Sequence, residues 1–141
     1  PFDKLITPAL QQVAPGAVVN VKTWPIEGKS LRDLEKYAQE TVRTLRPDLV
    51  LVAVPAAANA ETDEEFLRSY TWVLNWSLAF GHLEWDCLVV HPDVAQPESQ
   101  TPRGPLIRQI VRAQDLILID RGPDDPASPD SILGNALRRS W

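Results

Sequence analysis

Six consecutive apolar residues, Leu49–Val54, are the feature that most constrains the fold of this chain. The run has the length of a strand and contains no polar position, so both of its faces must be covered by other elements. A parallel sheet with helices on both sides provides that environment. The pattern therefore predicts a strand buried inside a parallel sheet, ended by Pro55.

Three further segments have the composition of short strands: Ala17–Val21, which follows the turn pair Pro15-Gly16, Trp85–Val90 and Leu116–Ile119. Each is rich in aliphatic or β-branched residues and is bounded by turn-forming residues. We therefore expect these segments to join Leu49–Val54 in one sheet.

Helical patterns separate the predicted strands. Leu31–Leu45 has apolar residues at helical spacing behind Ser30 as N-cap, and Asp63–Phe80 follows a capping box that begins at Thr62. Shorter helices are expected at three further places: Phe2–Val13, Leu106–Ala113 and the residues after Ser128. This alternation predicts a three-layer α/β fold with a flavodoxin-like parallel sheet.

The predicted order begins with a helix, whereas a helix in such a sheet normally follows a strand. In the flavodoxin-like strand order 2-1-3-4-5, the strand that is lacking here is the central one. We expect it to be supplied from before Pro1, because a sequence that begins with Pro and contains no Met is a processed or partial product. The length predicts a single domain over residues 1–141, incomplete at its N-terminus.

Composition limits the partners. The net charge of -5 comes from dispersed acidic and basic residues, which gives no electrostatic footprint for nucleic acid. No apolar run reaches the roughly 18 residues that span a bilayer, so no membrane association is expected. Cys87 and the two histidines have no metal-ligand spacing, and we expect no metal and no cofactor. A soluble protein is predicted, with the cytoplasm favoured and export left open.

The carboxyl ends of parallel strands are where ligands bind in open sheets. His91 is the only histidine expected at that edge, and its ring is a candidate general base. The structural alternative is that the imidazole bonds a loop carbonyl and that His91-Pro92 ends the strand. The other polar residues expected there are Glu27, Lys29, Ser30, Glu61, Asp93, Asp120, Arg121, Asp124 and Asp125. Turn formation is the alternative to cation binding by the acidic ones.

A second apolar line runs along Asp63–Phe80. Trp72, Trp76 and Phe80 recur every four residues and are offset from the face that carries Phe66. A soluble monomer rarely exposes two indoles and a phenyl ring together. The line therefore predicts either a homo-oligomer contact or burial beneath another segment.

The strands and their loops resemble the SGNH/GDSL hydrolase superfamily. The resemblance lies in Val18-Val19-Asn20 leading to Gly28 and a helix, and in the run Arg46–Val52, which is similar to the approach to the third block of the family. It implies a flavodoxin-like fold and hydrolysis of a small ester or acylated substrate by Ser, His and Asp. The nucleophilic Ser would precede Pro1, because this chain has no Gly-Asp-Ser motif.

The resemblance also implies site residues. Gly28 is the position that supplies an oxyanion-hole N–H, Asn59 is the substitute for the third-block Asn, and His91 is the candidate base. The loop before the last helix contains no histidine, so the Asp-x-x-His block of the family is absent. The function expected is ester or acyl hydrolysis, and the alternative is a catalytically inactive SGNH-like domain that binds a ligand or a protein.

Overall fold

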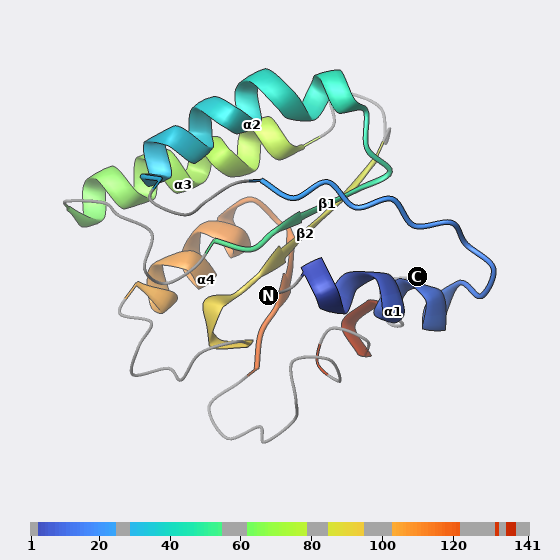
Figure 1. The fold of residues 1–141 in the computed structure, drawn as a ribbon. Coiled ribbons are helices and arrows are strands. Elements are labelled where there is room, and N and C mark those ends of the chain that lie inside the picture. Colours follow the sequence, from blue (N-terminus) through green and yellow to red (C-terminus); the bar gives the residue numbers. More distant parts are fainter. Residues whose placement is uncertain are drawn as a thin grey trace.

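The computed structural model describes residues 3–24, 29–54, 62–78, 85–94, 103–121, 132 and 135–137. Its centre is a parallel sheet of β1 (Leu49–Val52), β2 (Asp86–Val90) and β3 (Ile117–Ile119), in the order β1-β2-β3. Helices flank this sheet on both sides (Figure 1). The prediction of a three-layer α/β fold with a parallel sheet is confirmed.

The sheet register brings the carboxyl ends of the strands together. Leu49 lies opposite Asp86, and Leu88 lies opposite Ile117, with all strands running in the same direction. A short 3-10 helix, η1 (Pro92–Val94), follows β2 at this edge. Side chains after β2 and β3 are therefore neighbours, as the topology rule predicts.

The helices occupy the places that the apolar periodicity predicts. They are α1 (Asp3–Val13), α2 (Leu31–Leu45), α3 (Asp63–Ser77) and α4 (Gly104–Ala113). Ile132 and residues 135–137 are also helical, in the region of the predicted last helix. Within the described part of the chain, none of the helices has both the length and the apolar composition needed to cross a bilayer.

Side-chain caps begin α2 and α3. The Ser30 hydroxyl accepts from the backbone N–H of Asp33 at 3.2 Å, and the Asp33 carboxylate accepts from the backbone N–H of Ser30 at 2.9 Å. Thr62 accepts from the backbone N–H of Glu65 at 3.1 Å. These bonds satisfy N–H groups that have no partner within the helix, which is why these residues set the helix starts.

The prediction that the second long helix extends to Phe80 is wrong. The helix ends at Ser77, because Leu78 adopts extended backbone angles (φ -85°, ψ 146°). The Ser77 hydroxyl donates to the carbonyl of Val73 at 2.7 Å, and the Ser77 carbonyl accepts from the Trp85 indole at 2.9 Å. Phe80 and the predicted cap Gly81 lie outside the described residues.

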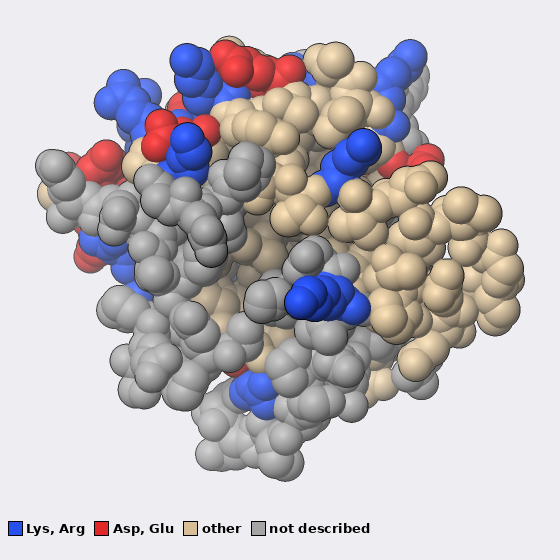
Figure 2. All heavy atoms as spheres, viewed as in Figure 1, with Lys and Arg blue, Asp and Glu red and all other residues tan. Residues whose placement is uncertain are grey.

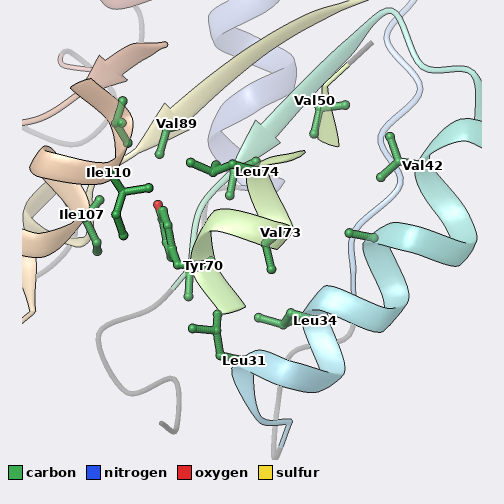
Figure 3. Packing of buried hydrophobic residues seen from close by; sticks show 14 of the residues in the cluster. Leu31, Leu34, Val42, Val50, Tyr70, Val73, Leu74, Val89, Ile107 and Ile110 are labelled. Carbon is green, nitrogen blue, oxygen red and sulfur yellow. The ribbon is translucent and has the colours of Figure 1, made fainter. Parts of the chain in front are cut away.

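Two apolar clusters cover the two faces of the sheet. In β1 the side chains alternate, so Val50 and Val52 enter the first cluster while Leu49 and Leu51 pack against the second. The first cluster joins the sheet to α2, α3 and α4, with Tyr70 of α3 among its fully buried members (Figure 3). The second cluster joins the sheet to α1 and to Ile132, Ala136 and Leu137. The apolar composition of β1 is thus explained, since one face is buried and the other is half-buried against the second cluster.

The predicted strand Ala17–Val21 is not a strand in the structure. The segment is extended but pairs with no other described strand, and the Val18 side chain is 88% exposed. In the predicted order 2-1-3-4-5 its ladder partner is the central strand, which is not among the described elements. The local pattern is that of a strand, but a strand forms only where a neighbour pairs with its backbone.

Candidate functional site

His91 lies at the carboxyl end of β2, at the edge where the topology predicts a site. Its backbone N–H donates to the carbonyl of Ile119 in β3 at 2.8 Å, so the residue continues the sheet ladder. The side chain is buried, with 1% exposed. The position is therefore the predicted one, but the ring faces the interior of the protein.

Both ring nitrogens of His91 are bonded within the protein. Nε2 lies 3.0 Å from the carbonyl oxygen of Gly104, and because a carbonyl only accepts, Nε2 carries the proton. Nδ1 accepts from the backbone N–H of Asp93 at 3.1 Å and lies 3.0 Å from the carboxylate Oδ1 of Asp93. The imidazole thus joins the end of β2 to the first residue of α4.

Asp93 is the centre of a network at this edge. The residue is buried, and its Oδ2 accepts from Nη2 of Arg108 at 2.6 Å. Its Oδ1 accepts from the backbone N–H of Arg121 at 3.1 Å. Arg108 also donates through Nη1 to Asp120 at 2.5 Å. One buried carboxylate therefore fixes the residues after β2, the helix α4 and the end of β3.

The charges in this network compensate one another. Desolvation lowers the pKa of Arg108, but the hydrogen bonds and the charges of Asp93 and Asp120 outweigh it and raise the pKa above its ordinary value. The Arg121 guanidinium donates to the backbone carbonyls of Asp93 at 3.0 Å and Val94 at 2.6 Å, which holds η1 in place. Arg108 was not predicted as a site residue, because its pattern in α4 is that of an ordinary helix surface position.

The other residues implied by the resemblance are not described. Gly28 and Asn59, the predicted oxyanion-hole positions, lie outside the described residues, as do Glu27, Glu61, Asp124 and Asp125. Of the predicted edge residues, Ser30 serves as the N-cap of α2. Within the described ranges, no group of three or more His, Cys, Asp or Glu side chains is arranged to hold a metal ion.

The outer face of α3 carries a pair of indoles. Trp72 and Trp76 stack with ring centroids 6.2 Å apart and an angle of 27° between their planes. Trp76 packs against the first cluster, whereas Trp72 is 42% exposed. The guanidinium of Arg43 in α2 lies 4.8 Å from the centroid of the Trp76 ring. The third member of the predicted line, Phe80, lies outside the described residues.

The hydroxyl of the buried Tyr70 lies within the first cluster, and the thiol of the half-buried Cys87 packs against it. Burial raises the pKa of the Cys87 thiol to about 12, and it raises the pKa of the Tyr70 hydroxyl still further, with the Cys87 charge as a smaller cause. The Tyr70 hydroxyl has no hydrogen-bond partner among the described residues, and it points into the aliphatic side chains around it (Figure 3). A thiol that stays protonated is a poor nucleophile, so Cys87 has the properties of a core residue.

Comparisons with known proteins leave the site to be interpreted from its geometry. No family model, no curated protein and no solved structure matches this chain. The resemblance to SGNH/GDSL hydrolases therefore stays a prediction.

Proposed function

We propose that this chain is an SGNH-like α/β domain that acts as a ligand- or protein-binding module, without a catalytic role for His91. The observation that carries the proposal is the pair of bonds on the buried imidazole, to the Gly104 carbonyl and to the Asp93 backbone N–H. A general base needs a free ring nitrogen within hydrogen-bond reach of the nucleophile. Nε2 can serve in that way only after it leaves Gly104.

We favour the exposed side of α3 as the contact surface of this binding module. Aromatic residues and Arg are enriched at protein interfaces, and Trp72 and Trp76 stack beside Arg43 on this side. We propose that this face contacts a second copy of the chain. In a symmetric dimer the same patch from each copy meets its equivalent, which would cover the exposed Trp72 indole of each copy.

Ester or acyl hydrolysis is the second candidate function. It is favoured by the short distance between Nδ1 of His91 and Oδ1 of Asp93, 3.0 Å, because a carboxylate in that position orients the base of a serine hydrolase. The mechanism would use a Ser supplied from before Pro1, oxyanion stabilisation by Gly28 and Asn59, and a small ester or acylated substrate. It would require the Nε2 bond to Gly104 to open and the proton to move from Nε2 to Nδ1, because the base of a serine hydrolase accepts at Nε2 while Nδ1 donates to the carboxylate.

A fluorophosphonate probe separates the two candidates, because it reacts covalently with activated serines. The full-length gene product is treated beside an established serine hydrolase, together with its variant His91→Gln. Gln can still donate to the Gly104 carbonyl but cannot act as a base. We expect no labelling of either protein. Stoichiometric labelling of the wild type that His91→Gln abolishes, with folding retained in circular dichroism, would overturn the proposal.

Self-association through α3 is tested by sedimentation of the wild type, Trp72→Glu and Trp72→Phe. The wild type and Trp72→Phe are expected to form the same oligomer, and Trp72→Glu to be monomeric, because it places a charge in an apolar contact. A monomeric wild type, or an oligomer that Trp72→Glu leaves intact, would rule out this contact surface.

A further inference from the structure

Among the residues that the structure describes, β1 is paired on one side only, and its other side is an open edge. The backbone N–H of Asp86 donates to the carbonyl of Asp48 at 3.1 Å, which fixes the side on which β1 meets β2. Successive peptide groups of an extended strand point alternately to its two sides. The N–H and C=O groups of Val50 and Val52 therefore face β2, and those of Leu49 and Leu51 face away from it. Among the described residues, β2 is the only strand paired with β1.

The open edge belongs to a strand that is covered on both faces. Val50 and Val52 are buried in the first cluster, and Leu49 and Leu51 pack against the second. Natural edge strands are usually protected by a charge, a proline or a bulge, and Leu49–Val52 contains neither a charged residue nor a proline. At the opposite edge of the sheet, Ile117 of β3 is 52% exposed, as is ordinary for an edge strand. The composition of β1 is that of an interior strand.

A second observation comes from the extended segment Ala17–Trp24. It leads from α1, which belongs to the second cluster, to α2, which belongs to the first, so it passes from one face of the sheet to the other. Figures 1 and 3 show it on the side of β1 that faces away from β2. Trp24 anchors its end through an edge-to-face contact with Tyr37 of α2, with ring centroids 5.2 Å apart. Before that anchor, Val18 is almost fully exposed.

Few charges flank the edge on the side of α1 and the extended segment, where Lys22 is the first charge after Lys4. No Asp, Glu, Lys or Arg occurs from Leu5 to Val21, over most of α1 and the first half of the extended segment. In Figure 2 the corresponding surface is almost entirely free of charged side chains, whereas basic and acidic groups are interspersed over α2. A charged strand would lose its hydration at this edge without gaining a partner.

We propose that the open edge of β1 receives one further parallel strand, formed by an uncharged, aliphatic polypeptide segment that lies outside these 141 residues. Its backbone would pair with Leu49 and Leu51, and its side chains would enter the two clusters alternately. Its other side would pair with Ala17–Val21, which is extended, rich in β-branched residues and not paired with any described strand. This inference goes beyond the proposed function, because it holds whether or not the domain has a catalytic role.

The edge is tested on the 141-residue chain by hydrogen exchange of single amides. In the chain alone, the amides of Leu49 and Leu51 are expected to exchange faster than those of Val50 and Val52, which are bonded to β2. The probe is a short peptide of alternating Val and Ile with Lys residues at both ends. On saturation with this peptide, exchange at Leu49 and Leu51 should slow by roughly fivefold to tenfold, the factor that the net free energy of one hydrogen bond gives.

Two controls separate strand pairing from unspecific apolar binding. A peptide of the same composition with a central Pro cannot continue a ladder and is expected not to bind. The protein variant Ala53→Pro removes an N–H from the open side while the ladder to β2 stays intact, so it should fold and bind the probe weakly. Its melting temperature and the exchange of Val50 and Val52 report whether the fold is retained.

Three results would overturn the proposal. The first is that the amides of Leu49 and Leu51 are already protected from hydrogen exchange in the chain alone at low concentration. The second is a probe that does not bind, or that binds the Pro-containing control equally well. The third is protection that appears only as the chain self-associates, because the occupant would then be a second copy.

Discussion

The carboxylate of Asp93 and the guanidinium of Arg108 form a partly buried ion pair at the end of β2, with Oδ2 and Nη2 2.6 Å apart. The Asp93 carboxylate is almost inaccessible, whereas the Arg108 side chain is 29% exposed. Loss of either partner therefore has different consequences. Without Arg108, the charge of Asp93 stays buried and loses this partner. Without Asp93, the guanidinium of Arg108 keeps its bond to Asp120 and can also be hydrated.

We expect Asp93→Ala to lower the free energy of unfolding by about 3 kcal/mol, because it also removes the acceptor for the Arg121 backbone N–H. Urea denaturation measures the change, with the exposed substitution Glu40→Ala as the control. Arg108→Ala leaves the Asp93 charge buried without this partner, so it should cost clearly more than Glu40→Ala. The two substitutions at the pair are expected to be non-additive, and strict additivity in the double-mutant cycle would show that the two side chains are not coupled.

The sheet and its helices are predictable from the sequence because their signals are local. The apolar run of β1 reflects burial on both faces, and Ser30 and Thr62 mark helix starts through bonds to residues three positions away. The Asp93–Arg108 pair has no such signal. It joins residues 15 positions apart whose contact depends on how α4 docks after β2.

Ala17–Val21 shows a different limit of prediction from the sequence. Its residues have the right composition for a strand, but pairing depends on a neighbour that local sequence does not specify. His91 shows a third limit, since the sequence places it at the correct edge of the sheet without stating which way its ring faces. The structural alternative to a base, a bond of the imidazole to a carbonyl, corresponds to the contact with Gly104.

The hydroxyl of Tyr70 offers a stabilising substitution. It is buried in the first cluster without a hydrogen-bond partner among the described residues. A buried polar group of this kind costs about 1–3 kcal/mol, so Tyr70→Phe is expected to raise the free energy of unfolding by about 1 kcal/mol. The ring and its stacking on Phe66, with centroids 5.4 Å apart, are preserved by the substitution. A destabilised Tyr70→Phe variant in urea denaturation would reveal a hydrogen bond to the hydroxyl.

The cap of α2 should make the free energy of unfolding fall as the pH falls in the acidic range. Backbone and side-chain hydrogen bonds from Ser30 lower the pKa of Asp33 below its ordinary value of 3.8. The folded carboxylate therefore contributes stability above pH 3.8, and the contribution is lost as the pH falls through the lower folded pKa. Ser30→Ala should cost about 1 kcal/mol at neutral pH and should weaken this acid dependence. Ser30→Ala keeps the backbone N–H that donates to Asp33 and should lose only part of the dependence, whereas equal acid dependence in the wild type and Asp33→Asn would contradict the assignment.

Cys87 should make the free energy of unfolding fall as the pH rises in the alkaline range. Burial raises its pKa from 9.0 to about 12, so between these values the unfolded chain has lost a proton that the folded chain retains. Fewer bound protons in the unfolded state mean that the free energy of unfolding falls as the pH rises, by up to about 1.4 kcal/mol per pH unit for one group. The contribution is fully present below pH 9 and is lost as the pH approaches 12.

The Cys87→Ala variant isolates this contribution. Its free energy of unfolding should fall less steeply than that of the wild type above pH 9, while a constant difference below pH 9 reports the lost packing volume. The thiol should also resist a disulfide reagent in the native protein at neutral pH and react at once in urea, because the thiolate is the reacting species. A native thiol that reacts as fast as the unfolded one would place Cys87 at the surface and would remove the basis for its raised pKa.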